Sequence, residues 1–103
     1  MDFSNMLNQA KELQEKMGTI QKELAGKTVT GSAGGGMVTA TLNGKGELVG
    51  IILEPGIIST QQIDMIQDMI VAAINDGARK ATDLSRGEMA KLTGGINIPG
   101  FSL

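Results

Sequence analysis

The sequence predicts an α+β fold: a long N-terminal helix, a three-stranded antiparallel meander and a long C-terminal helix. Three observations lead to this prediction. Apolar residues near the N-terminus recur every three or four positions, which is the spacing of one helix face. The middle of the chain changes to alternating β-branched residues, and the following segment returns to helical spacing. With 103 residues, a single domain over 1–103 is the simplest organisation.

The first helix is predicted over residues 3–25. Its apolar positions are separated alternately by three and four residues, as in the a/d seam of a coiled coil. The seam consists of Phe3, Met6, Ala10, Leu13, Met17, Ile20 and Leu24. Such a narrow stripe leaves two interpretations open. The seam packs only on its own chain, or it also contacts another subunit.

Three strands are predicted over residues 27–31, 37–43 and 47–54. In the second strand, Val38, Ala40 and Leu42 share one face, while the threonines between them occupy the other. Asn43-Gly44 is a strong hairpin signal. The third strand carries apolar side chains on both faces, so we expect it to be covered on both sides.

The second helix is predicted over about residues 60–92, followed by a loose tail over 93–103 that contains Gly and Pro. Its apolar stripe comprises Ile63, Ile66, Ile70, Ala73, Ile74, Gly77, Ala81 and Leu84. At 1.5 Å per residue the two helices reach about 35 Å and 45–50 Å, longer than a compact domain of this size. We therefore expect a second copy to complete the core. The expected interface residues are Met6, Leu13, Met17, Ile20, Ile51, Leu53, Ile66, Ile70 and Ile74.

The stretch TGSAGGGM, residues 30–37, is rich in glycine like a phosphate-binding loop. A P-loop needs Lys and then Ser or Thr after its last glycine, but Gly36 is followed by Met37. A dinucleotide-binding loop joins a strand to a helix, whereas this stretch joins two predicted strands. We interpret it as a hairpin bend in which glycine permits positive φ.

Composition argues against most enzyme classes. The chain has no Cys and no His, which removes thiol nucleophiles, the commonest general base and the commonest metal ligands. We therefore predict no catalytic residues, no metal, no cofactor and no small-molecule substrate. No apolar run approaches the ~20 residues that cross a bilayer, and the N-terminus lacks the features of a signal peptide. The expectation is a cytoplasmic protein without a membrane partner.

The ordered set of segments resembles the YbaB/EbfC family of bacterial nucleoid-associated proteins. The resemblance rests on "VTGSAGGGMVTATLNGKGELVGIILEP" and then "DMIVAAINDGARKA", and it covers nearly the whole chain. It implies a tweezer-like homodimer that binds double-stranded DNA in the nucleoid, with little sequence preference and without enzymatic activity. It also implies effects on nucleoid organisation and gene expression.

DNA binding would rely on basic side chains, although the net charge of the chain is −2. Basic residues collect along the first helix and in the second half of the second helix. The candidate DNA-binding residues are Lys11, Lys16, Lys22, Lys27, Arg79, Lys80, Arg86 and Lys91. Residues 77–92 carry four basic and two acidic side chains, net +2, whereas residues 59–76 carry net −3. The alternative function is a protein-interaction module whose apolar helical seam binds a partner protein, which the acidic net charge favours.

Overall fold

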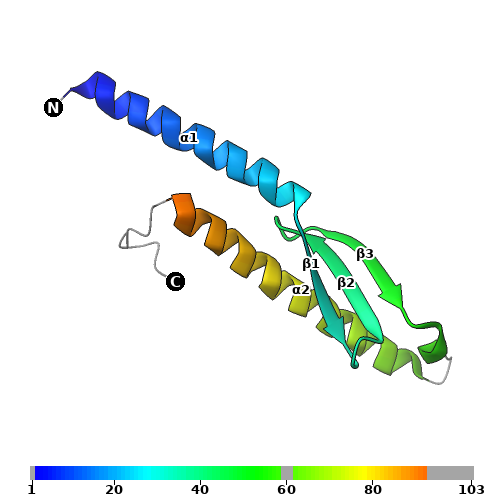
Figure 1. Ribbon diagram of the computed structural model, residues 1–103. Coiled ribbons are helices and arrows are strands. Elements are labelled where there is room, and N and C mark those ends of the chain that lie inside the picture. Colours follow the sequence, from blue (N-terminus) through cyan, green and yellow to red (C-terminus); the bar gives the residue numbers. More distant parts are fainter. Residues whose placement is uncertain (1, 59–61, 93–103) are drawn as a thin grey trace.

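The computed structural model describes residues 2–58 and 62–92, and the predicted tail over 93–103 lies outside these ranges. The elements are α1 (Phe3–Gly26), β1 (Thr28–Ala33), β2 (Val38–Asn43), β3 (Leu48–Leu53), a 3-10 turn (Pro55–Ile57) and α2 (Ile63–Leu92) (Figure 1). Two long helices flanking a three-stranded antiparallel sheet confirm the predicted fold class.

The strands form a simple meander in the order β1-β2-β3. In register, Gly31 of β1 lies opposite Ala40 of β2, which lies opposite Ile51 of β3. β1 runs to Ala33, so it includes the first half of the glycine-rich stretch that sequence assigned to a bend. The bend itself is Gly34–Gly36, whose φ angles of 64°, 68° and 94° favour glycine.

The core lies between α2 and one face of β1 and β2. The predicted alternation of β2 is confirmed, because Val38, Ala40 and Leu42 are buried while the threonines between them are half-buried on the opposite face. Ala73 of α2 packs against this row and is fully buried. Small residues on α2 allow the helix to lie close to the sheet.

The closest approach of helix and sheet is at Gly31 and Gly77. A Cβ atom on Gly31 would collide with the backbone carbonyl oxygen of Ala73 and the backbone nitrogen of Gly77. A Cβ atom on Gly77 would collide with the Leu42 side chain. Gly31 therefore requires glycine for space, whereas a methyl group at Gly77 would require the buried Leu42 side chain to shift. Neither glycine has positive φ.

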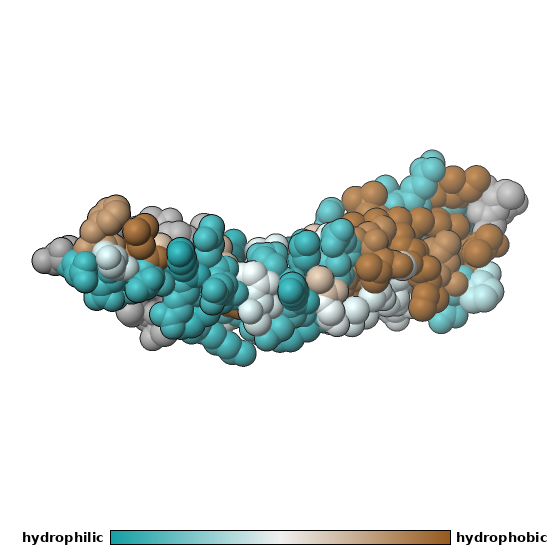
Figure 2. Space-filling model, turned by 90° about the horizontal axis from the view of Figure 1, so that it is seen from above, coloured by the Kyte–Doolittle hydropathy of each residue, from teal (hydrophilic) through white to brown (hydrophobic). Residues whose placement is uncertain are grey.

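β3 is exposed, contrary to the expectation that both of its faces are covered. Leu48, Val49, Ile51 and Ile52 are all exposed, and Leu53 is half-buried. The reason is that α2 packs on β1 and β2 and does not extend over β3. Figure 2 shows the result as a broad hydrophobic area on the half of the molecule that contains the sheet.

The other half of the molecule consists of two projecting helices. α1 and the C-terminal half of α2 run antiparallel and extend beyond the sheet in the same direction (Figure 1). The molecule measures 70 × 24 × 16 Å with a radius of gyration of 19.1 Å, against about 13 Å for a compact domain of this length. Only Ile20 and Leu24 of the α1 seam are buried, so the chain covers just one end of the seam.

Neither of the described helices combines the length and apolar character needed to cross a membrane.

Candidate nucleic-acid interface

The basic residues fall into two groups according to whether a carboxylate holds them. Lys27, Arg79, Lys80 and Lys91 form ion pairs. Within residues 2–58 and 62–92, the remaining cations have no ion pair within 4 Å. These unpaired cations are Lys11, Lys16, Lys22, Lys45 and Arg86. The distinction matters because a polyanion competes with the carboxylate for a paired cation but not for an unpaired one.

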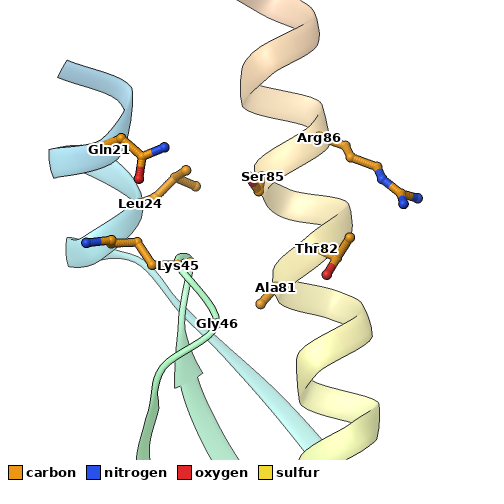
Figure 3. A pocket seen from close by; sticks show the side chains of 9 residues that line it. Gln21, Leu24, Lys45, Gly46, Ala81, Thr82, Ser85 and Arg86 are labelled. Carbon is orange, nitrogen blue, oxygen red and sulfur yellow. The ribbon is translucent and has the colours of Figure 1, made fainter. Parts of the chain in front are cut away.

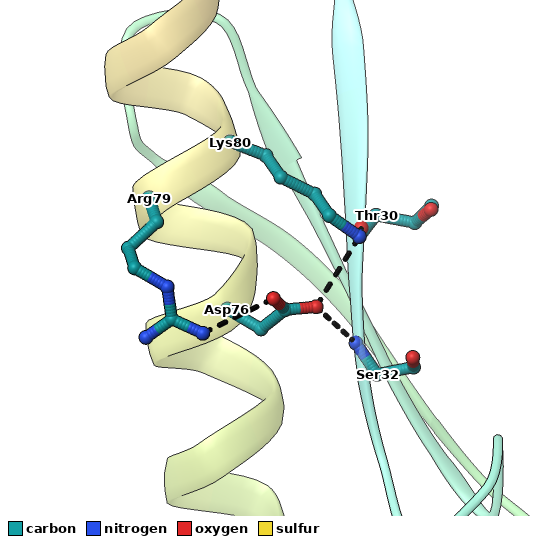
Figure 4. A network of polar contacts seen from close by, with 5 residues as sticks. All are labelled: Thr30, Ser32, Asp76, Arg79 and Lys80. Atoms are coloured by element: carbon teal, nitrogen blue, oxygen red, sulfur yellow. Dashed lines mark hydrogen bonds and ion pairs between the residues drawn. The ribbon is translucent and has the colours of Figure 1, made fainter.

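Asp76 holds two of the paired cations and also contacts β1 (Figure 4). Its Oδ1 atom lies 3.1 Å from the Arg79 guanidinium, and its Oδ2 atom lies 3.2 Å from Lys80 Nζ. Oδ2 also accepts a 3.0 Å hydrogen bond from the backbone N–H of Ser32. That N–H bond, followed by the contact with Lys80, lowers the pKa of Asp76 below its ordinary value.

The same network also forms hydrogen bonds with backbone groups on the outer edge of β1, the edge that faces away from β2. Ser32 N–H is bonded by Asp76, and the Thr30 carbonyl accepts a 2.9 Å bond from Lys80 Nζ. Thr30 and Ser32 lie on alternate positions of an edge strand, where backbone groups point away from β2. Side chains of α2 therefore hydrogen-bond to backbone groups of β1 that could otherwise pair with another strand.

We call α1 and the projecting C-terminal half of α2 the two arms. Glu88 of α2 connects them through an ion pair with Lys27, close to where the arms leave the sheet. Its Oε1 atom lies 2.8 Å from Lys27 Nζ, which follows the last turn of α1, and 3.5 Å from Lys91 Nζ. Glu88 is 8% exposed and is one of the two buried polar residues in the described ranges. The hydrogen bond with Lys27 lowers the pKa of Glu88 and raises the pKa of Lys27.

These pKa shifts give a prediction for pH. Asp76 and Glu88 have lower pKa values in the folded chain than in the unfolded one, so their stabilisation is complete above the unfolded pKa of about 4. It is lost as the pH falls through the folded values. We expect thermal unfolding to move to lower temperature between pH 5 and 3, and Asp76→Asn to reduce this dependence. Asp68→Asn is the control, because Asp68 has no ion pair within 4 Å in the described ranges. An equal effect of both variants on the pH dependence would contradict the prediction.

The unpaired cations are spread over three elements. Lys11, Lys16 and Lys22 lie on α1, Arg86 lies in the projecting half of α2, and Lys45 lies in the turn between β2 and β3. Sequence analysis identified four of them and missed Lys45. The available signal was the sequence Asn43–Glu47, where a hairpin turn places a basic side chain between two glycines.

A cavity of about 290 Å³ lies between α1 and α2, where the two helices leave the sheet (Figure 3). It is bounded by the end of α1, the β2–β3 turn and α2. The lining residues are Gln21, Leu24, Gly44, Lys45, Gly46, Ala81, Thr82, Ser85 and Arg86. Two of the unpaired cations therefore border the same cavity although they are far apart in the sequence.

Within the described ranges, no group of three or more acidic residues could hold a metal ion. A second hollow, on the surface of α2, is lined by Asn75, Ala78, Arg79, Thr82, Asp83 and Arg86. The described part of the molecule thus offers cations on projecting helices rather than a cluster of acidic metal ligands. Such an arrangement is typical of proteins that bind an extended polyanion.

Comparisons with known proteins agree with this class. Residues 1–96 match the model of the YbaB/EbfC DNA-binding family. The chain is 52% identical over 99 residues to a protein of Desulfotalea psychrophila named nucleoid-associated protein DP1429, covering 96% of this chain and 93% of that one. It is 46% identical over 99 residues to a nucleoid-associated protein of Syntrophobacter fumaroxidans, covering 96% and 90%. The chain belongs to the YbaB/EbfC DNA-binding family, as the resemblance of its segments predicted.

The fold has a solved counterpart. The crystal structure of uncharacterized protein HP0035 from Helicobacter pylori superposes with a TM-score of 0.80. The match covers 91% of this chain and 99% of that chain at 23% sequence identity. At this identity the likeness concerns the fold alone.

Proposed function

We propose that the chain is a non-enzymatic nucleoid-associated protein that binds duplex DNA as a homodimer, mainly through phosphate contacts. The observation that carries the proposal is the set of unpaired cations, which project from the arms and from the turn beside them. Contacts of this kind position a protein on DNA without reading its sequence, so little sequence preference follows. Phe3 and Phe101 are the only aromatic residues, which disfavours binding to single strands by base stacking.

The acidic net charge is compatible with this proposal because the charges are segregated along α2. Asp64 and Asp68 lie in the first half of α2, beside the sheet, whereas Arg86 lies in the projecting half. Asp76 and Glu88 are neutralised by the cations that they hold. The projecting half of α2 can therefore contact DNA phosphates while the acidic half remains distant from them. Such binding would contribute to nucleoid organisation and gene expression.

The proposed dimer forms through β3. This strand has no neighbour on its outer side in the described sheet, and both of its faces carry exposed apolar residues. Exposed apolar area combined with an unpaired strand edge is typical of an interaction surface. β1, the other edge strand, has side chains of α2 bonded to its outer backbone groups. Of the expected interface residues, Ile51 and Leu53 lie on β3, whereas Ile66, Ile70 and Ile74 are half-buried on α2 and pack against the core of the chain.

The remaining expected interface residues lie on α1. Met6, Leu13 and Met17 are exposed along the arm, and Ile20 is already buried within the chain. We assign them to the arm rather than to the dimer interface. Their exposure favours one second candidate function, the binding of a partner protein along the α1 seam.

The salt dependence of DNA binding tests the proposal. Binding to a labelled duplex should weaken as salt rises, with a slope in log–log form of about −0.9 per phosphate contact. Changing Lys11, Lys16 and Lys22 together to Gln should weaken binding and make the slope shallower. The matched control changes Glu12, Glu15 and Glu23 of the same helix to Gln and should strengthen binding. Salt-independent binding, or equal effects of the two triple variants, would favour the protein-binding alternative.

A further inference from the structure

We propose that Met37, Met65 and Met69 form a binding site for a soft monovalent metal ion of the class of Cu(I). The site lies beside the Gly34–Gly36 bend between β1 and β2, at the end of the sheet away from the arms (Figure 1). The prediction of no metal rested on the absence of Cys and His and did not consider methionine sulfur. The proposal is therefore independent of DNA binding, which we assign to the arms.

Two of the three methionine side chains meet at Gly34, the first residue of the bend. A Cβ atom added to Gly34 would collide with the sulfur of Met69 and would lie 3.2 Å from the Cε methyl group of Met37. Met69 belongs to α2, whereas Met37 directly precedes β2. The fold therefore brings two thioethers that are distant in the sequence to the same point.

The contacts between α2 and β1 place the third methionine beside the same bend. Along one side of α2, three side chains face three alternate positions of β1 and the bend. The pairs are Lys80 with Thr30, Asp76 with Ser32, and Met69 with Gly34. These contacts advance towards the bend as α2 is followed back to its start. Met65 lies one turn before Met69 on the same side of α2, with the Cβ atoms about 5–6 Å apart. Met65 is therefore placed next to the bend.

An ion can reach these sulfurs from solvent. Met37 is 37% exposed and Met65 is 43% exposed, while Met69 is half-buried at the border of the core. An added Cβ atom on Gly35 would have nothing within 4 Å, which leaves room for an ion beside the bend. Methionine is unbranched and has three rotatable bonds, so its sulfur can turn towards an ion without movement of the backbone.

The chemistry of the ligands determines the class of ion. Thioether sulfur favours Cu(I), whereas carboxylates and carbonyls suit magnesium, calcium and manganese. The surrounding charge attracts a cation. Asp64 and Asp68 are exposed, and each directly precedes a methionine of the proposed site. Residues 34–37 and 63–76 contain no Lys or Arg. Neutral soft ligands with carboxylates nearby therefore suit a soft cation of low charge.

The experiment compares two double variants of the full chain with equal numbers of changes. The site variant is Met65→Leu with Met69→Leu. The control is Met6→Leu with Met17→Leu, whose side chains are exposed on α1 and lie about 16 Å apart along the helix, too far to share an ion. Leucine conserves the volume of methionine, so both variants should fold. Cu(I), kept reduced with ascorbate under nitrogen, is titrated in competition with a colorimetric chelator. The site variant should bind at least tenfold more weakly than the wild type and the control.

A second measurement identifies the ligands with Ag(I), a diamagnetic ion of the same class. In NMR spectra of the wild type with labelled methionine methyl groups, the signals of Met37, Met65 and Met69 should shift, while those of Met6 and Met17 should not. Ag(I) should also raise the unfolding temperature of the wild type and the control, but not that of the site variant. Equal Cu(I) affinity of the site variant and the wild type, or equal shifts of all five methyl signals, would overturn the inference.

Discussion

Replacing Gly31 with alanine should destabilise the fold by about 3 kcal/mol or more, because the added methyl group has no space. Its Cβ atom would collide with backbone atoms of Ala73 and Gly77 in α2, which cannot move aside like the end of a flexible side chain. The helix would have to lift from the sheet and would open the core around Leu42 and Ala40. Thermal unfolding should show the loss as a fall of more than about 10 °C.

The matched control is Gly18→Ala. Gly18 lies inside α1, has nothing within 4 Å of an added Cβ atom and does not have positive φ. Alanine there should stabilise the protein by up to about 1 kcal/mol, because it favours the helix. A Gly31→Ala protein that is as stable as wild type would show that helix and sheet are farther apart than described.

Replacing Ile51 with aspartate should separate the proposed dimer into subunits of 10.7 kDa. The side chain is 37% exposed in the single chain, so the charge can reach water there. In a dimer formed through β3 the same charge would be buried without a partner, which costs several kcal/mol. Sedimentation at micromolar concentration measures the mass. Losing the second set of arms should also weaken DNA binding by about a hundredfold.

Leu13→Asp is the control for this variant. Leu13 is 48% exposed and lies on α1, so it is matched in chemistry but outside the β3 surface. We expect it to remain a dimer. If Leu13→Asp separates the subunits while Ile51→Asp does not, the α1 seam is the interface and the assignment to β3 is wrong.

Local periodicity was sufficient to predict the fold. The alternation of Val38, Ala40 and Leu42 with threonine identified the buried face of β2, since every second residue of a strand shares a face. The three-four spacing that ends at Ile20 and Leu24 identified α1. Such patterns do not show how far a neighbouring element extends. For this reason sequence analysis expected β3 to be covered although α2 stops short of it.

The candidate interface was less predictable because it depends on contacts between distant residues. Lys27 and Glu88 are 61 positions apart, and no local pattern pairs them. Sequence analysis therefore counted Lys27, Arg79, Lys80 and Lys91 equally with cations that have no carboxylate beside them. The steric requirement for glycine at position 31 could not be predicted from the sequence for the same reason. An added Cβ would collide with residues that lie more than forty positions later.

The protected edge of β1 has a consequence for how many copies can join. A three-stranded sheet with two open edges could accept a neighbour on each side, and such head-to-tail addition continues into a fibre. Because Asp76 and Lys80 occupy backbone groups at one edge, only the opposite edge remains available for strand pairing. Growth by strand addition would then stop after a single twofold step, and the particle would have a finite size.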